Sequence, residues 1–98
     1  MMVIGHEDYT YFLLRDGDAF YLDANCNHGP VGYSILIRLN DEEVARYRAE
    51  GAAYVRGLAI GIHNAVPIAN PASEYALRNI VADSPVGKQV LAAIRRAA

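Results

Sequence analysis

The chain has 98 residues, which predicts a single domain over 1–98, and 53% of them are hydrophobic while 20% are charged. The net charge of −2 argues against a nucleic-acid-binding protein, because such proteins carry a concentrated basic face. The single cysteine excludes an internal disulfide and is typical of a cytoplasmic protein. The start of the chain resembles no signal peptide, and no apolar run is long enough to span a bilayer, so we expect no membrane association.

The first part of the chain predicts a β-hairpin. Residues 9–15 and 19–24 are two apolar runs rich in aromatic side chains, and the Asp-Gly step between them is a strong hairpin signal. A three-residue loop at 16–18 separates the aliphatic residues and phenylalanines from most of the tyrosines. On one face it places Phe12, Leu14, Phe20 and Leu22, and on the other Tyr9, Tyr11, Leu13, Tyr21 and Asp23.

A two-residue loop is the alternative, and it groups a different set on one face. That set is Tyr11, Leu13, Phe20 and Leu22. We favour the three-residue loop because it keeps the plain hydrophobic side chains together. Residues 25–32 then have a loop composition, with Gly29-Pro30 marking a turn. A third strand is expected over 33–39, where the core face consists of Tyr33, Ile35, Ile37 and Leu39.

A long helix is predicted from Asn40 to about His63. Asn40 followed by Glu43 matches a capping box at its start. Apolar residues then recur at helical spacing from Val44 to Ile62 and form a stripe that would lie on the sheet. Glycines inside this segment leave an alternative open, in which the helix ends near 56 and residues 58–62 form a further strand.

Two shorter helices are expected at the end of the chain. Asn70-Pro71 is a start signal for a weak helix over 71–81, and Ser84-Pro85 is a start signal for a helix ending near Ala97. The stripe of the last helix is Val86, Val90, Leu91 and Ile94. These elements together predict an α+β fold: a three-stranded antiparallel meander with the long helix packed on one face and one or two short C-terminal helices.

The strongest polar constellation lies at 23–28, in the expected loop. The candidate ligand-binding residues are Asp23, Cys26, His28 and, from the end of the long helix, His63. A zinc site needs three or four ligands, and the chain has only one Cys and three His, so we predict no metal site. Cys26 and His28 could instead act as a thiol and its base. We favour a structural role, with Cys26 buried and the polar residues forming turn hydrogen bonds, and we predict no catalytic residue and no cofactor.

Tyrosines are the second notable feature, and Tyr9, Tyr11 and Tyr21 are candidates for an interface. The alternative is that the C-terminal helices cover the same face within one chain. We therefore expect a cytoplasmic homodimer with a non-catalytic binding or regulatory role. A small-molecule-binding or metal-binding protein, or a thiol enzyme, built on 23–28 is the alternative function.

Overall fold

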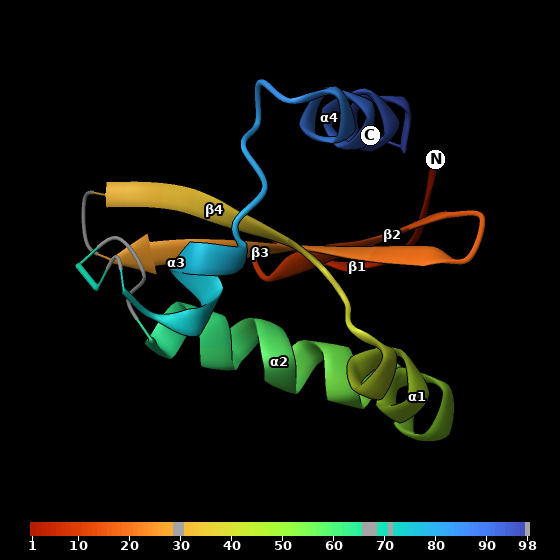
Figure 1. Cartoon of the computed structure of the whole chain (residues 1–98), viewed down its shortest axis with the longest axis horizontal. Coiled ribbons are helices and arrows are strands. Elements are labelled where there is room, and N and C mark those ends of the chain that lie inside the picture. Colours follow the sequence, from red (N-terminus) through yellow and green to blue (C-terminus); the bar gives the residue numbers. More distant parts are fainter. Residues whose placement is uncertain (29–30, 66–68, 71, 98) are drawn as a thin grey trace.

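A computed structural model describes residues 1–28, 31–65, 69–70 and 72–97 of the chain. In these residues, four antiparallel strands form one sheet in the order β1-β2-β3-β4, and helices lie on both sides of it (Figure 1). In chain order the elements are β1 (Met2–Glu7), β2 (Tyr11–Asp16), β3 (Ala19–His28), β4 (Val31–Arg38), α1 (Asp41–Glu50), α2 (Ala52–Asn64), α3 (Glu74–Arg78) and α4 (Pro85–Ala97). The predicted α+β fold is confirmed, and β1 is an additional strand that the sequence pattern did not reveal.

The hairpin between β2 and β3 has a two-residue loop, Gly17-Asp18. Asp16 pairs with Ala19, and the register continues from there along both strands. Gly17 has a φ of 60°, in the left-handed region that glycine adopts without steric penalty. The three-residue loop that we favoured is wrong, and the two-residue alternative is right. The reason is that both faces of the sheet are buried, so the tyrosines and the aliphatic residues have no need to segregate.

The strand β3 is longer than expected, and β4 begins earlier. Cys26 pairs with Tyr33 and Asn25 pairs with Ser34, so the segment predicted as a loop at 25–32 is mostly strand. The prediction failed because turn-forming residue types occupy alternate positions of a strand whose other side chains face the core. Gly29 and Pro30 lie outside the described residues.

The larger core lies between one face of the sheet and the helices α1 and α2. Its buried members are Tyr11, Leu13, Phe20, Leu22, Ala24, Cys26, Ile35, Ile37, Leu39, Val55, Ala59 and Ile62. The predicted core face of 33–39 is therefore confirmed, and so is the docking of the helical stripe on the sheet. The stripe does not belong to one continuous helix, however, because α1 ends at Glu50 and α2 starts at Ala52.

Gly51 separates the two helices. Its φ of 73° and ψ of −151° lie in a region that is open almost only to glycine. The capping box at the start of α1 is present as predicted: Glu43 N donates to Asn40 Oδ1 at 2.8 Å, and Asn40 N donates to Glu43 Oε1 at 2.9 Å. Residues 58–62 are helical, so the strand alternative is wrong.

A second, smaller core lies on the opposite face of the sheet, beneath α4 (Figure 1). Its buried members are Leu14, Tyr21, Leu36, Val90 and Ala93. The helix spans Pro85 to Ala97 as expected, and Gly87 N donates to the Ser84 hydroxyl at its start. Tyr21 is therefore covered within its own chain.

The segment between α3 and α4 crosses the edge of the sheet at β4 (Figure 1). Ile80 N donates to Leu36 O at 2.7 Å, and Leu36 N donates to Asn79 Oδ1 at 2.9 Å. These bonds occupy an edge of the sheet that would otherwise expose unpaired backbone groups. The start signal that we assigned to Asn70 is wrong, because Ser73 caps α3 and its hydroxyl accepts from Ala76 N; Pro71 lies outside the described residues.

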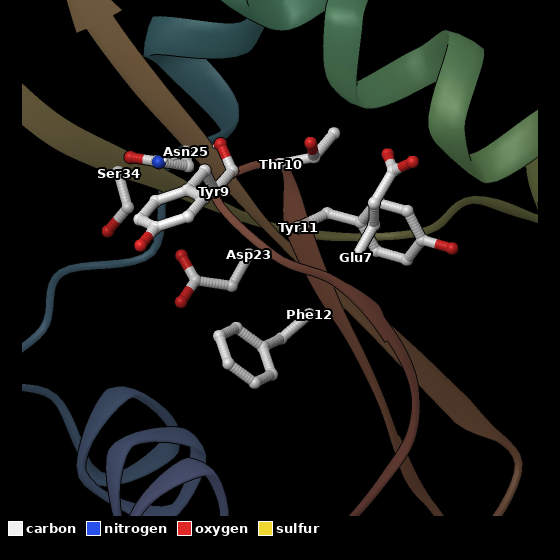
Figure 2. A pocket seen from close by; sticks show the side chains of 8 residues that line it. All are labelled: Glu7, Tyr9, Thr10, Tyr11, Phe12, Asp23, Asn25 and Ser34. Carbon is white, nitrogen blue, oxygen red and sulfur yellow. Dashed lines mark hydrogen bonds between the residues drawn. The ribbon is translucent and has the colours of Figure 1, made fainter. Parts of the chain in front are cut away.

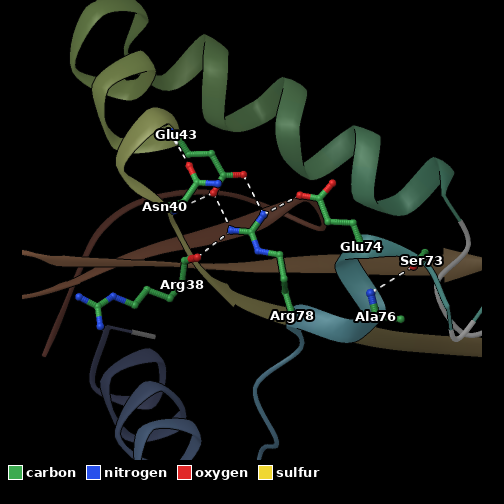
Figure 3. A network of polar contacts seen from close by, with 7 residues as sticks. All are labelled: Arg38, Asn40, Glu43, Ser73, Glu74, Ala76 and Arg78. Atoms are coloured by element: carbon green, nitrogen blue, oxygen red, sulfur yellow. Dashed lines mark hydrogen bonds and ion pairs between the residues drawn. The ribbon is translucent and has the colours of Figure 1, made fainter.

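A buried ion pair joins α3 to the start of α1 (Figure 3). Arg78 donates to both carboxylate oxygens of Glu43, at 2.6 Å and 3.0 Å, and also to the carbonyl oxygen of Arg38 at the end of β4. Glu74 accepts a further hydrogen bond from Arg78. The helix α3 is thereby fixed to the junction between β4 and α1, about forty residues earlier in the chain.

Candidate functional site

The sheet face beneath α4 changes from apolar to polar along its strands. Tyr21 and Leu36 are covered by the helix, and the next positions on the same face are Asp23 on β3 and Ser34 on β4, since side chains alternate along a strand. Asn25 pairs with Ser34 and continues the polar surface. The polar part of this face therefore lies next to the part that α4 covers.

A pocket of about 260 Å³ opens at this polar surface, and we call it the Asp23 pocket (Figure 2). It is lined by Glu7, Tyr9, Thr10, Tyr11, Phe12, Asp23, Asn25 and Ser34. Figure 2 shows the Asp23 carboxyl between the Tyr9 and Phe12 rings, with Ser34 nearby. The lining thus combines two carboxyl groups, several aromatic rings, hydroxyls and an amide.

Asp23 is the least compensated polar group of the pocket. Its Oδ1 atom is buried and has no hydrogen-bond partner among the residues that the structure describes. Its neighbours on the adjacent strands are Phe12 and Leu36, whose side chains have no hydrogen to donate. Burial raises the pKa of the Asp23 carboxyl, and the Ser34 hydroxyl lowers it only in part. A carboxyl in this position is stabilised by any partner that supplies a hydrogen-bond donor or a positive charge.

The turn between β1 and β2 forms the mouth of the pocket. Tyr9 has a φ of 62°, a left-handed conformation that is uncommon for a residue with a side chain, and its side chain is 93% exposed. Two bonds from Asn25 hold the turn: Nδ2 donates to Tyr9 O at 2.8 Å, and the backbone N donates to Thr10 O at 2.9 Å. These bonds hold the backbone of the turn, which carries an exposed tyrosine at the mouth of the pocket.

The remaining acid of the lining, Glu7, is already paired. Arg56 on α2 donates to both of its carboxylate oxygens at 3.1 Å. Glu7 pairs in register with Tyr11, on the face of the sheet that packs against α2, whereas Asp23 lies on the α4 face. No lysine or arginine lines the described part of the pocket, so the charge of Asp23 has no partner there.

Of the four predicted ligand-binding residues, the structure places Asp23 and Cys26 on opposite faces of the sheet. Cys26 is fully buried in the core on the α2 side, and burial raises the pKa of its thiol, with the Tyr33 hydrogen bond lowering it in part. Asp23 faces the other side of the sheet. His28 is the last residue of β3, and its side chain lies outside the described residues. His63 is in the last turn of α2, where Nδ1 lies 3.4 Å from Asn64 Oδ1.

The three tyrosines predicted to share a face are also separated. Tyr11 is buried in the core beneath α2, Tyr21 is buried beneath α4, and Tyr9 stands in the turn at the mouth of the pocket. The expected common face of Tyr9, Tyr11 and Tyr21 is wrong, because the hairpin register places Tyr11 and Tyr21 on opposite sides. Neither buried tyrosine is available to a partner in this fold.

Several residues of the pocket were not found from sequence, chiefly Ser34, Phe12 and Glu7. Ser34 carried no signal of its own, because it shares with Arg38 the alternate face that was predicted to lie away from the core. Its proximity to Asp23 depends on the β3–β4 register, which extends through residues that resemble a loop.

Among the described residues, no group of three or more His, Cys, Asp or Glu side chains is arranged to hold a metal ion. In the same part of the chain, no helix has the length and apolar character needed to cross a bilayer. Comparisons with protein-family models, curated proteins and solved structures give no match to this chain.

Proposed function

We propose that the protein is a non-catalytic binding protein whose Asp23 pocket takes a small cationic ligand, an ammonium group. The observation that carries this proposal is the buried Asp23 Oδ1 atom, which has no hydrogen-bond partner in the described part of the chain and lines an open pocket. Buried polar atoms are nearly always hydrogen-bonded, so an orphaned carboxyl oxygen is a favourable place for a ligand that donates.

The charge and the aromatic content of the pocket favour a cation over an anion. Glu7 is neutralised by Arg56, which leaves Asp23 as the unpaired charge of the described lining. The Phe12 and Tyr9 rings line the pocket with the carboxyl, and aromatic rings attract cations. An ammonium group provides three donors and a compact positive charge, which match the carboxyl and the neighbouring Ser34 and Asn25 oxygens.

A binding role fits the pocket better than a catalytic one. The lining contains two carboxyl groups and several hydroxyls, and the described lining includes no histidine, cysteine or lysine. Nucleophilic catalysis by a hydroxyl requires an adjacent base that is itself oriented by a third group. Ser34 has the Asp23 carboxyl as its neighbour but no such third group.

The test is a titration with n-propylammonium chloride, followed by backbone amide NMR shifts. We expect saturable shifts at Asp23, Asn25 and Ser34, and at least a ten-fold weaker affinity in Asp23→Asn. Asp16→Asn is the matched control, since it makes the same substitution at an exposed aspartate. Asp16 is at the end of β2, whereas Asp23 pairs with Phe12 near the start of that strand. The proposal fails if propylammonium shifts none of these amides, or if both variants lose affinity equally.

A second candidate function is self-association through β1, the expected homodimer. The edge of β4 is occupied by Asn79 and Ile80, whereas β1 is the last strand on the other side of the described sheet. Met2 and Ile4 on β1 are 63% and 39% exposed. An exposed apolar edge strand is a template for pairing with a second copy.

Light scattering at micromolar concentration tests this second candidate. We expect twice the chain mass of 10.7 kDa for the wild type and a monomer for Ile4→Lys, because a lysine on an edge strand opposes pairing. Leu77→Lys is the control, since it changes an exposed apolar residue on α3. A wild-type monomer removes the dimer, and ligand binding at Asp23 is measured independently of it.

A further inference from the structure

A second cavity, of about 150 Å³, lies between α4 and the sheet, and we call it the α4 cavity. Its walls are mostly apolar and include Leu36, Ile80, Val90, Leu91 and Ile94. The cavity is partly open to solvent, and its volume is large enough for a group of about six carbon atoms, such as a benzene ring.

The α4 cavity and the Asp23 pocket share two wall residues, Asp23 and Ser34. The Asp23 carboxyl therefore lies between a polar pocket and an apolar cavity. A ligand that places a charged head on Asp23 has an apolar compartment directly beside that head. An ion without a hydrocarbon part would leave the compartment unfilled.

The helix that roofs this cavity is held at its first turn. A Cβ atom added to Gly87 would lie 2.4 Å from Val81 O and 2.7 Å from Ala82 O, so α4 approaches the preceding segment as closely as a glycine allows. At the other end of the helix, Arg96 donates to Met1 O at 3.2 Å. The first turn of α4 is therefore held close to the segment that precedes it, at one end of the cavity that Gly87 lines.

We propose that the ligand is an amphiphilic amine, with an ammonium head on Asp23 and an apolar tail of about six carbons in the α4 cavity. This inference rests on the proposed function of the Asp23 pocket and adds the class of ligand. Each methylene buried in the cavity tightens binding by about three- to four-fold. Tail length is therefore the quantity that the structure predicts.

The experiment compares n-hexylammonium with n-propylammonium, and uses 1-hexanol and hexanoate as probes with the same tail and a different head. We expect hexylammonium to bind at least about ten-fold more tightly than propylammonium. It should shift the amide and methyl NMR signals of Ile80, Val90 and Leu91 together with those of Asp23. Hexanol should bind more weakly, and hexanoate should not bind measurably.

Two variants separate the head from the tail. Asp23→Asn should reduce the advantage of hexylammonium over hexanol by about ten-fold or more. Leu91→Ala should weaken hexylammonium about three-fold or more and leave propylammonium unchanged. Leu91 is 45% exposed, so this variant is expected to fold, and amide dispersion verifies that. Gln89→Ala is the control, because Gln89 is an exposed α4 residue that does not line the cavity.

The possible results separate this inference from the proposed function. If propylammonium binds at Asp23 and hexylammonium binds no more tightly, the tail inference is overturned and the proposed function stands. If neither amine binds, both are overturned. If hexanol binds as tightly as hexylammonium, the cavity selects only the apolar group and the amphiphilic amine is rejected.

Discussion

The Arg78 guanidinium holds the Glu43 carboxylate with two hydrogen bonds, at 2.6 Å and 3.0 Å, although Glu43 is only 8% exposed. Removing one partner of such a pair leaves a buried charge without compensation. We expect Arg78→Ala to lower the free energy of unfolding by about 2–4 kcal/mol, measured by urea denaturation. Lys88→Ala is the control: it removes an exposed ion pair with Asp83, and a change of about 0.5 kcal/mol or less is expected.

Acid provides a second measurement on the same variant. Burial alone would raise the pKa of Glu43, but the bonds from Arg78 and Asn40 outweigh it and hold that pKa below its ordinary range. The stabilisation is therefore complete above the ordinary pKa of a glutamate, near 4, and is lost as the pH falls through the lowered value. The difference in free energy of unfolding between the wild type and Arg78→Ala should therefore become smaller in acid. A difference that does not change with pH would contradict a role for this ion pair.

Asp23 should have the opposite effect on stability. Its pKa is raised in the folded protein, so the folded state binds the proton more tightly and stability falls as the pH rises from about 4 through the raised value. We expect Asp23→Asn to stabilise the protein at pH 7 by about 1–2 kcal/mol, and by less at pH 3. Thermal unfolding at both pH values measures this. A destabilised Asp23→Asn at pH 7 would show that the carboxyl has a stabilising partner.

The glycines of the helical region should respond differently to alanine. Gly51→Ala places a side chain in a backbone conformation open almost only to glycine and should destabilise the protein by about 1–3 kcal/mol. Gly57→Ala is the matched control, because it lies inside α2 with no atom within 4 Å of the added Cβ. That control should stabilise by about 0.5–1 kcal/mol through helix propensity. Equal effects would mean that α1 and α2 form one continuous helix.

Cys26 should react slowly with a thiol reagent in the native protein. Its side chain is fully buried, and burial raises the pKa of the thiol, so little thiolate forms near neutral pH. Labelling should become fast only when denaturant unfolds the chain. Fast labelling of the native protein at the rate of a free thiol would restore the thiol-enzyme alternative for the 23–28 segment.

Features that depend only on residues close together in the chain could be predicted from the sequence. The capping box needs only Asn40 and Glu43, three residues apart, and Ser84-Pro85 begins a helix by the same local rule. The alternation over 33–39 gave the core face of β4, because side-chain direction along a strand has a fixed period. The Asp23 carboxyl was also among the predicted ligand-binding residues.

Features that depend on contacts between distant segments of the chain could not be predicted from the sequence. The strand β1 has only a short apolar run, Met2 to Ile4, and becomes a strand by pairing with β2. The hairpin register depended on whether one or both faces are buried, and that depended on α4, more than sixty residues further along the chain. The ion pair between Arg78 and Glu43 could not be predicted, because the two residues are 35 positions apart and meet only in the folded chain.

The sequence by itself determined the α+β class, the starts of α1 and α4 and the apolar face of β4, because each depends on interactions within a few residues. Tertiary structure alone decided the pocket: Tyr9, Asp23 and Ser34 come from a turn and two strands, and they meet only in the observed register. The tertiary structure also decided that the Asp23 Oδ1 atom is buried without a hydrogen-bond partner among the described residues, and burial is the largest cause of the raised pKa of that carboxyl.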